Sequence, residues 1–195
     1  MNQAEIFQCE RARGASIGAT IVGGFGAAWL AMGITGAGVP VQVALAVVVP
    51  VFALIAGLGS VVRRRLLKIA GEETPEKKQM MRIFAVVNVV QWLAIFGTVN
   101  VLRNLHLDAW VIPSIVMIVG AHFIPLARIF QAPQHLKTGI AMMLCAAMAL
   151  VLPGSIRDAV ECVAAGLILW VSAAGALHAA FRMTPRSPLA AQAGL

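Results

Sequence analysis

A single carboxylate lies deep inside an apolar run of this sequence. Glu161 shares a helical face with Ser172 at about 100° per residue. A carboxyl about one turn inside an apolar helix, on a face of small residues, suits a proton or cation site, because an isolated charge is costly to bury. The alternative is a structural one, in which Glu161 snorkels or pairs with Arg157, four residues earlier, or with Arg103.

Two histidines also lie within apolar runs. His122 precedes Pro125, which leaves the carbonyl of Ala121 without its helical N–H donor. Such a free acceptor beside a titratable ring is typical of sites in broken membrane helices, and a water or the ring itself could also satisfy it. His178 lies at a comparable distance from a following arginine, so a shared haem or metal site is a further hypothesis.

A polar stripe occupies the apolar run after residue 82. Asn88, Gln91 and Thr98 fall within about 80° of one another on a helix. We expect this stripe to face protein instead of lipid, either as amide hydrogen bonds between helices or as the lining of a polar path.

The composition indicates that these residues lie in membrane-spanning helices. The chain has 195 residues, of which 60% are hydrophobic and only 12% charged, and its mean hydropathy is +0.88. Soluble domains have about a quarter of their residues charged. The composition therefore excludes a soluble enzyme, a nucleic-acid-binding domain and a disulfide scaffold.

The apolar runs predict an all-α bundle of six transmembrane helices in a single domain covering 1–182, with a disordered cytoplasmic tail at 183–195. With both termini in the cytoplasm, thirteen of the fifteen Lys and Arg residues lie inside, which the positive-inside rule favours strongly. The predicted spans are 15–35, 40–62, 75–102, 109–128, 137–152 and 157–182. The fifth is short for a span.

Seven basic residues concentrate between the second and third runs, which accounts for much of the net charge of +7. Beside apolar helices, the polyanion they meet is lipid, so anionic phospholipids of the cytoplasmic face are the expected partners, and nucleic acid is not. The residues expected at lipid headgroups are Arg63, Arg64, Arg65, Lys68, Lys77 and Lys78.

Small residues recur along the first run, including Gly23 and Ala27. Such residues let helix backbones approach closely in lipid, so we expect this helix at the centre of the packing. On that basis leucine at Gly23 or Ala27 should destabilise the protein, and Leu30→Ala should matter less.

Metal-binding and nucleotide-binding motifs are missing from the sequence. It contains no H-E-x-x-H, C-x-x-C or G-K-[ST] motif. We therefore expect no catalytic residue, no metal site and no bound cofactor.

One segment carries a family resemblance. Residues 120–139, GAHFIPLARIFQAPQHLKTG, resemble the H-F-x-P-L-A-R…P…T-G segment of small six-helix bacterial membrane proteins. The resemblance covers about twenty residues and implies a multi-pass protein of the bacterial inner membrane. It implies no activity.

Three classes of function follow from these observations. The leading one is handling of a small solute or ion through or within the bundle, with His122, Glu161, Asn88, Gln91 and Arg103 along the pathway. The second is a membrane scaffold or assembly subunit that binds another membrane protein or a second copy of this chain. The third is a haem or redox membrane protein built on His122 and His178.

Overall fold

The computed structural model describes residues 3–66 and 75–184, except the side chains of 3–5, 76 and 77. These residues form six α-helices and one 3-10 turn, with no strand among them, which confirms the all-α prediction. The elements are α1 (Gln3–Gly36), α2 (Val41–Arg65), α3 (Pro75–Asn104), η1 (Asp108–Trp110), α4 (Val111–Ile129), α5 (Pro133–Ala149) and α6 (Gly154–Met183).

Five of the six helices are long and apolar enough to cross a membrane, so the chain has the helices of a multi-pass membrane protein. Their candidate spans are Ile6–Gly36, Val41–Arg65, Lys78–Asn104, Asp108–Ile129 and Gly154–Met183. Helix α5 has 17 residues, a rise of about 25 Å where a full crossing takes about 30 Å.

Helix boundaries follow local chemistry. Pro75 and Pro133 are the first residues of α3 and α5, where the missing N–H costs no helical bond. Helix α5 therefore begins four residues before the predicted 137 and ends at Ala149, before the predicted 152. Helix α1 begins at Gln3 instead of 15, because the polar residues before the apolar run continue its first turns. Of the predicted tail, residues 185–195 lie outside the described residues.

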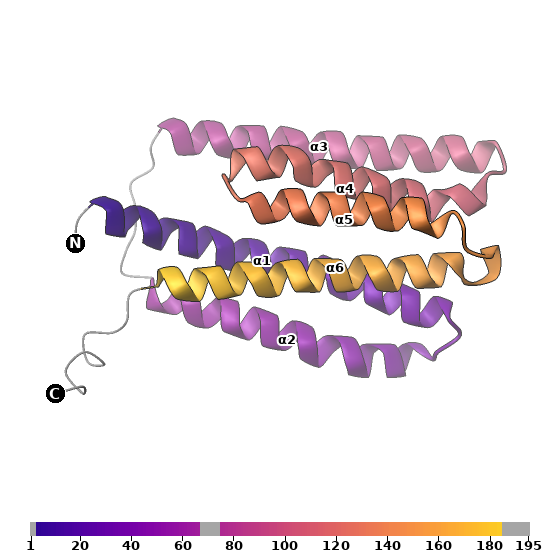
Figure 1. Cartoon of the computed structure of the whole chain (residues 1–195), viewed down its shortest axis with the longest axis horizontal. Helices are drawn as coiled ribbons and strands as arrows, with labels where there is room; N and C mark the ends of the chain where they lie inside the picture. Colours follow the sequence, from indigo (N-terminus) through magenta and orange to yellow (C-terminus); the bar gives the residue numbers. More distant parts are fainter. Residues whose placement is uncertain (1–2, 67–74, 185–195) are drawn as a thin grey trace.

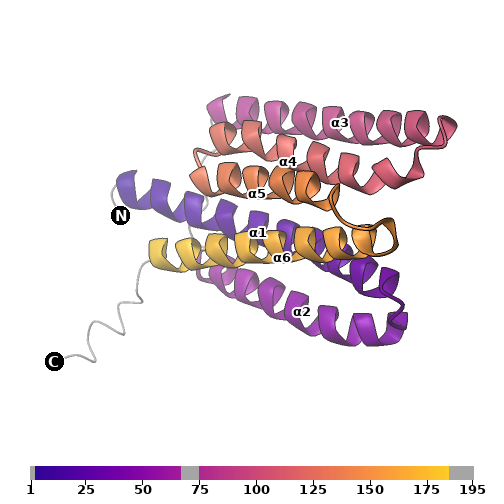
Figure 2. The same ribbon diagram turned by 45° about the vertical axis from the view of Figure 1, so that its right-hand side comes forward.

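The helices form two groups. In Figures 1 and 2, α3, α4 and α5 lie side by side, and α1, α6 and α2 lie below them in these views. Helix α3 packs mainly against α4, whereas α6 packs against α1, α2, α4 and α5. Helix α1 was predicted at the centre of the packing, and it makes the most extensive contact of the fold, with α6. The helix with the most partners is nevertheless α6.

Close backbone approach holds α1 against α6. A Cβ built on Gly166 would lie 2.8 Å from the Gly26 carbonyl oxygen, and a Cβ on Gly33 would lie 2.8 Å from the Ala159 carbonyl oxygen. The Trp170 indole N–H also donates to the Gly23 carbonyl at 3.0 Å. Glycine is thus required on both sides of this contact, as expected for helices that associate in lipid.

Basic side chains gather at one end of the bundle, which we call the basic end. Here α2, α4 and α6 end and α1, α3 and α5 begin (Figure 1). The last turns of α2, α4 and α6 all carry arginine. The candidate residues Glu161 and His122 lie between the basic end and the opposite end of the bundle.

Candidate functional site

Glu161 is the most unusual side chain of the described structure. It lies in the second turn of α6 and is only 1% exposed. Neither carboxylate oxygen has a hydrogen-bond partner among the described residues. Buried carboxylates are almost always paired or hydrogen-bonded, because an isolated charge is costly to bury. Glu161 is therefore a buried carboxyl without a hydrogen-bond partner among the described residues.

The ion pairs considered for Glu161 are not formed. Arg157 and Asp158 are its charged neighbours, but the Arg157 guanidinium donates to the Leu152 carbonyl at 3.0 Å. Arg103 is exposed at the end of α3, which packs mainly against α4. Because Glu161 is buried, it also does not snorkel to the surface.

Two thiols accompany the carboxyl. Cys145 on α5 and Cys162 on α6 lie close enough to Glu161 to interact with it electrostatically. Both cysteines are free. Within residues 3–66 and 75–184, no group of three His, Cys, Asp or Glu side chains is arranged to hold a metal ion. The titratable neighbours of Glu161 are thus Arg157 and Asp158 on its own helix and the two thiols of Cys145 and Cys162.

Further along α6, the polar face predicted from the sequence continues toward the basic end. The hydroxyl groups of Ser172 and Thr138 on α5 are hydrogen-bonded at 2.8 Å. Between this pair and Glu161, the side chains of Met142 and Leu169 are buried in the core. The contact of α5 with α6 therefore has polar groups at two levels, separated by apolar packing.

His122 lies nearer the basic end, in an aromatic cluster that includes a second histidine. Its ring lies close to the Val87 backbone of α3 and interacts with His135 at the start of α5. His135 stacks on Phe123 with ring centroids 5.8 Å apart. The Nδ1 atoms of both histidines are buried and have no hydrogen-bond partner within residues 3–66 and 75–184. The sequence analysis missed His135, although it lies within the segment 120–139.

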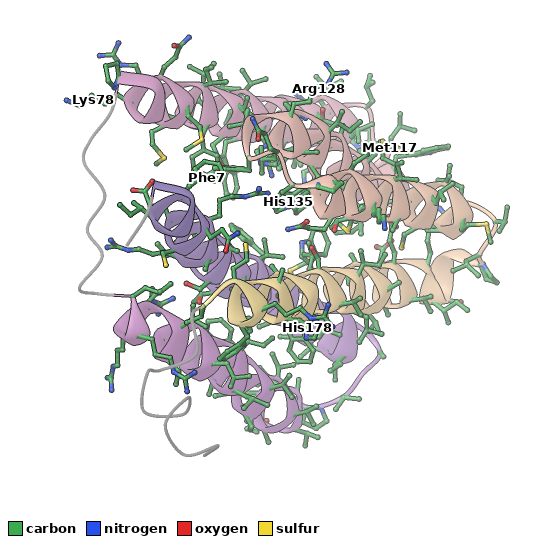
Figure 3. The ribbon with its side chains drawn as sticks, turned by 60° about the vertical axis from the view of Figure 1, so that its left-hand side comes forward. Phe7, Lys78, Met117, Arg128, His135 and His178 are labelled. Atoms are coloured by element: carbon green, nitrogen blue, oxygen red, sulfur yellow. The ribbon has the colours of Figure 1, made fainter. Side chains whose placement is uncertain are left out.

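His178 is remote from this cluster. It is exposed and lines a groove between α2 and α6, and Figure 3 shows His135 and His178 on separate helices of the bundle. His122 packs in the other helix group, against α3. The two histidines considered for a shared haem or metal site are therefore not brought together.

The polar stripe on α3 lies on the half-buried face that packs against α4, as predicted. Asn88, Gln91 and Thr98 are all half-buried. The Asn88 amide donates to the Phe84 carbonyl of its own helix at 2.8 Å. One N–H group of this amide is therefore engaged within α3 itself.

The residues expected at lipid headgroups separate into two kinds. Arg63 is half-buried, and its guanidinium donates to the hydroxyl groups of Thr20 at 3.2 Å and Ser60 at 2.8 Å, which ties α2 to α1. Arg64, Arg65 and Lys78 are exposed at the basic end. Lys68 and the side chain of Lys77 lie outside the described residues.

Comparison with known proteins adds no family to these observations. No family model, no curated protein and no solved structure matches this chain. The function must therefore be argued from the site itself.

Proposed function

We propose that this chain handles a small solute or ion through or within its helix bundle, and that Glu161 binds the proton or small cation involved. The observation that carries the proposal is a carboxyl that is 1% exposed in an apolar helix and has no hydrogen-bond partner among the described residues. Ionisable groups inside membrane helices are expensive and mark ion or proton pathways. A carboxyl that binds and releases a proton or a cation cannot at the same time be held by a permanent hydrogen-bond partner within the protein.

The apolar layer between Glu161 and the Ser172–Thr138 pair supports a closed state of such a pathway. Met142 and Leu169 are 0% and 1% exposed, so buried apolar side chains separate the two polar levels. Beyond this layer, His122 and His135 offer two more unpartnered polar atoms toward the basic end. We propose His122 as the second proton- or cation-binding group of the pathway, with Gln91 one turn along α3 from the Val87 backbone that His122 approaches.

Replacing Glu161 by glutamine tests the proposal. Gln keeps the size and hydrogen-bonding capacity of the side chain but cannot exchange a proton or balance a cation. In liposomes that contain the full chain and a dye sensitive to H⁺, Na⁺ or K⁺, we expect Glu161→Gln to reduce the flux of that ion to the level of protein-free liposomes. The control is Asp158→Asn, which removes an exposed carboxylate one turn away and should leave the flux unchanged.

The same assay decides between the functional classes. Flux that is reduced equally by Glu161→Gln and Asp158→Asn would reflect general electrostatics and overturn the role of Glu161. Wild-type flux equal to that of protein-free liposomes for all three ions would favour a scaffold or assembly subunit. An unchanged flux for His122→Gln would remove His122 from the pathway.

We further propose six crossings of the bacterial inner membrane with both termini in the cytoplasm. This arrangement puts the basic end inside, and α5 then crosses although it is short, because α4 and α6 cover it. Reporter fusions after Ala70, Gln134 and Ala190 should report the cytoplasm, and fusions after Gly36, Leu105 and Gly154 the outside. A cytoplasmic signal at both Gln134 and Gly154 would show that α5 does not cross.

A further inference from the structure

A long apolar groove runs along the outer face of the bundle between α2 and α6. Its volume is about 550 Å³, and its walls include Val51, Leu54 and Leu58 of α2 and Val171 and Ala174 of α6. In a membrane this surface faces acyl chains. The groove is separate from Glu161, which faces α5.

The groove is long enough to cover the depth of one leaflet. On α6 its lining extends from Leu167 to Phe181, which is about 21 Å at about 1.5 Å per residue. The hydrocarbon of one leaflet is about 15 Å deep, half of a core of about 30 Å. One acyl chain can therefore lie along the groove from its headgroup to the bilayer centre.

Basic groups end the groove at the basic end of the bundle. His178 lines it and is exposed. The heptad spacing from Val51 through Leu58 places Arg65 on the same face of α2, and Arg182 follows His178 by one turn on α6. Both arginines are exposed, whereas Arg63 is turned toward α1. Beyond the lined part of the groove, each of its two helices thus carries one exposed guanidinium toward the basic end, and the His178 imidazole belongs to the lining itself.

We propose that this groove binds one anionic phospholipid of the leaflet at the basic end, with an acyl chain between α2 and α6 and its phosphate between Arg65 and Arg182. His178 lies at the level where the chain joins the headgroup. Charge complementarity selects this occupant: an apolar slot alone would accept any acyl chain, but two guanidinium groups at its mouth favour a net negative headgroup. The site goes beyond the proposed ion pathway and does not depend on it.

Trp170 reports the occupancy directly, because its ring lines the groove. The full chain is reconstituted in phosphatidylcholine vesicles and titrated with bromine-labelled phosphatidylglycerol or bromine-labelled phosphatidylcholine, and quenching of the Trp170 fluorescence is taken as the difference from Trp170→Phe. We expect the anionic lipid to quench at lower mole fraction. Arg65→Gln and Arg182→Gln should each reduce this preference about fivefold, and the double variant about 30-fold.

Matched variants separate the site from general surface charge. Arg128→Gln with Lys137→Gln removes two exposed basic side chains at the same end of the bundle, outside the groove, and should leave the preference intact. Ala174→Trp fills the groove and should abolish the Trp170 quenching by either lipid, whereas Val86→Trp on the exposed face of α3 should not. Because an added tryptophan contributes its own fluorescence, each variant is compared with its own Trp170→Phe partner.

Three results would overturn the proposal. The first is an equal loss of preference in the Arg128 and Lys137 double variant. The second is unchanged Trp170 quenching in Ala174→Trp, and the third is a free fatty acid or a second copy of the chain, found by native mass spectrometry, where the phospholipid should be. Should either Arg variant fail to fold, native mass spectrometry of the wild type still tests for one retained anionic phospholipid.

Discussion

Replacing Gly166 by alanine should destabilise the protein by about 1–3 kcal/mol, and replacing it by leucine should prevent recovery of folded protein. The added Cβ would lie 2.8 Å from both the Gly26 carbonyl oxygen and the Leu30 backbone nitrogen. Both are backbone atoms of α1, so no side-chain rotation relieves the clash, and α1 must move away from α6. The measurement is a thermal melt in detergent, with monodispersity on size exclusion as the second readout.

Other glycines provide the controls for this experiment. A Cβ on Gly24 would meet the Phe52 ring at an ordinary 3.5 Å, and a Cβ on Gly97 would meet nothing within 4 Å. Gly24→Ala and Gly97→Ala should therefore melt like the wild type or slightly higher. Equal destabilisation at Gly97 and Gly166 would show that the effect comes from helix flexibility and not from the contact of α1 with α6.

The helices themselves could be predicted from the sequence. Six apolar runs bounded by charge, proline or glycine correspond to the six helices, because a run's length and its boundaries depend on residues close together in the chain. The stripe of Asn88, Gln91 and Thr98 was placed on a protein-facing side for the same reason, since periodicity fixes the face of one helix.

The partners of each helix could not be predicted in this way. Small residues marked α1 as tightly packed, but nothing in the sequence showed that α6 contributes Gly166 to the contact. As a consequence Leu30 was ranked below Gly23 and Ala27. Leu30 is only 5% exposed and packs on Gly166, whereas a Cβ on Gly23 would meet only the side chain of Ile55. The structure therefore makes Leu30→Ala a cavity-forming substitution at the main contact.

In the candidate site, too, the sequence indicates single residues but not their contacts with other helices. Glu161 could be singled out because a carboxylate in an apolar run is rare. Whether it pairs with Arg157 or Arg103 depends on side-chain directions that the sequence does not contain. His135 was missed because it follows a helix break, where a histidine has water as an ordinary partner. Its stacking on Phe123 depends on the turn between α4 and α5, which the sequence pattern does not reveal.

Replacing Glu161 by leucine should stabilise the protein while it abolishes the flux proposed above. Most substitutions at buried positions destabilise a protein. Burying a polar group that has no hydrogen-bond partner, however, costs a protein about 1–3 kcal/mol, and we apply this value to the Glu161 carboxyl. Leucine is apolar, of similar volume and a good helix former, so it should recover about that amount. The melting temperature of Glu161→Leu should be higher than that of the wild type. Asp158→Leu, at an exposed position three residues away, is the control for added apolar surface.

An ion pair predicts the opposite sign, which makes the experiment decisive. Removing one member of a buried pair leaves the other charge uncompensated and costs about 3–5 kcal/mol. Glu161→Leu would then melt lower than the wild type, and Arg157→Gln or Arg103→Gln would partly rescue it. The Arg157 guanidinium donates to the Leu152 carbonyl, and Glu161 has no hydrogen-bond partner in the part of the chain that the structure describes. We therefore expect no such rescue. A higher melting temperature together with lost flux would identify Glu161 as a position where stability is given up for function.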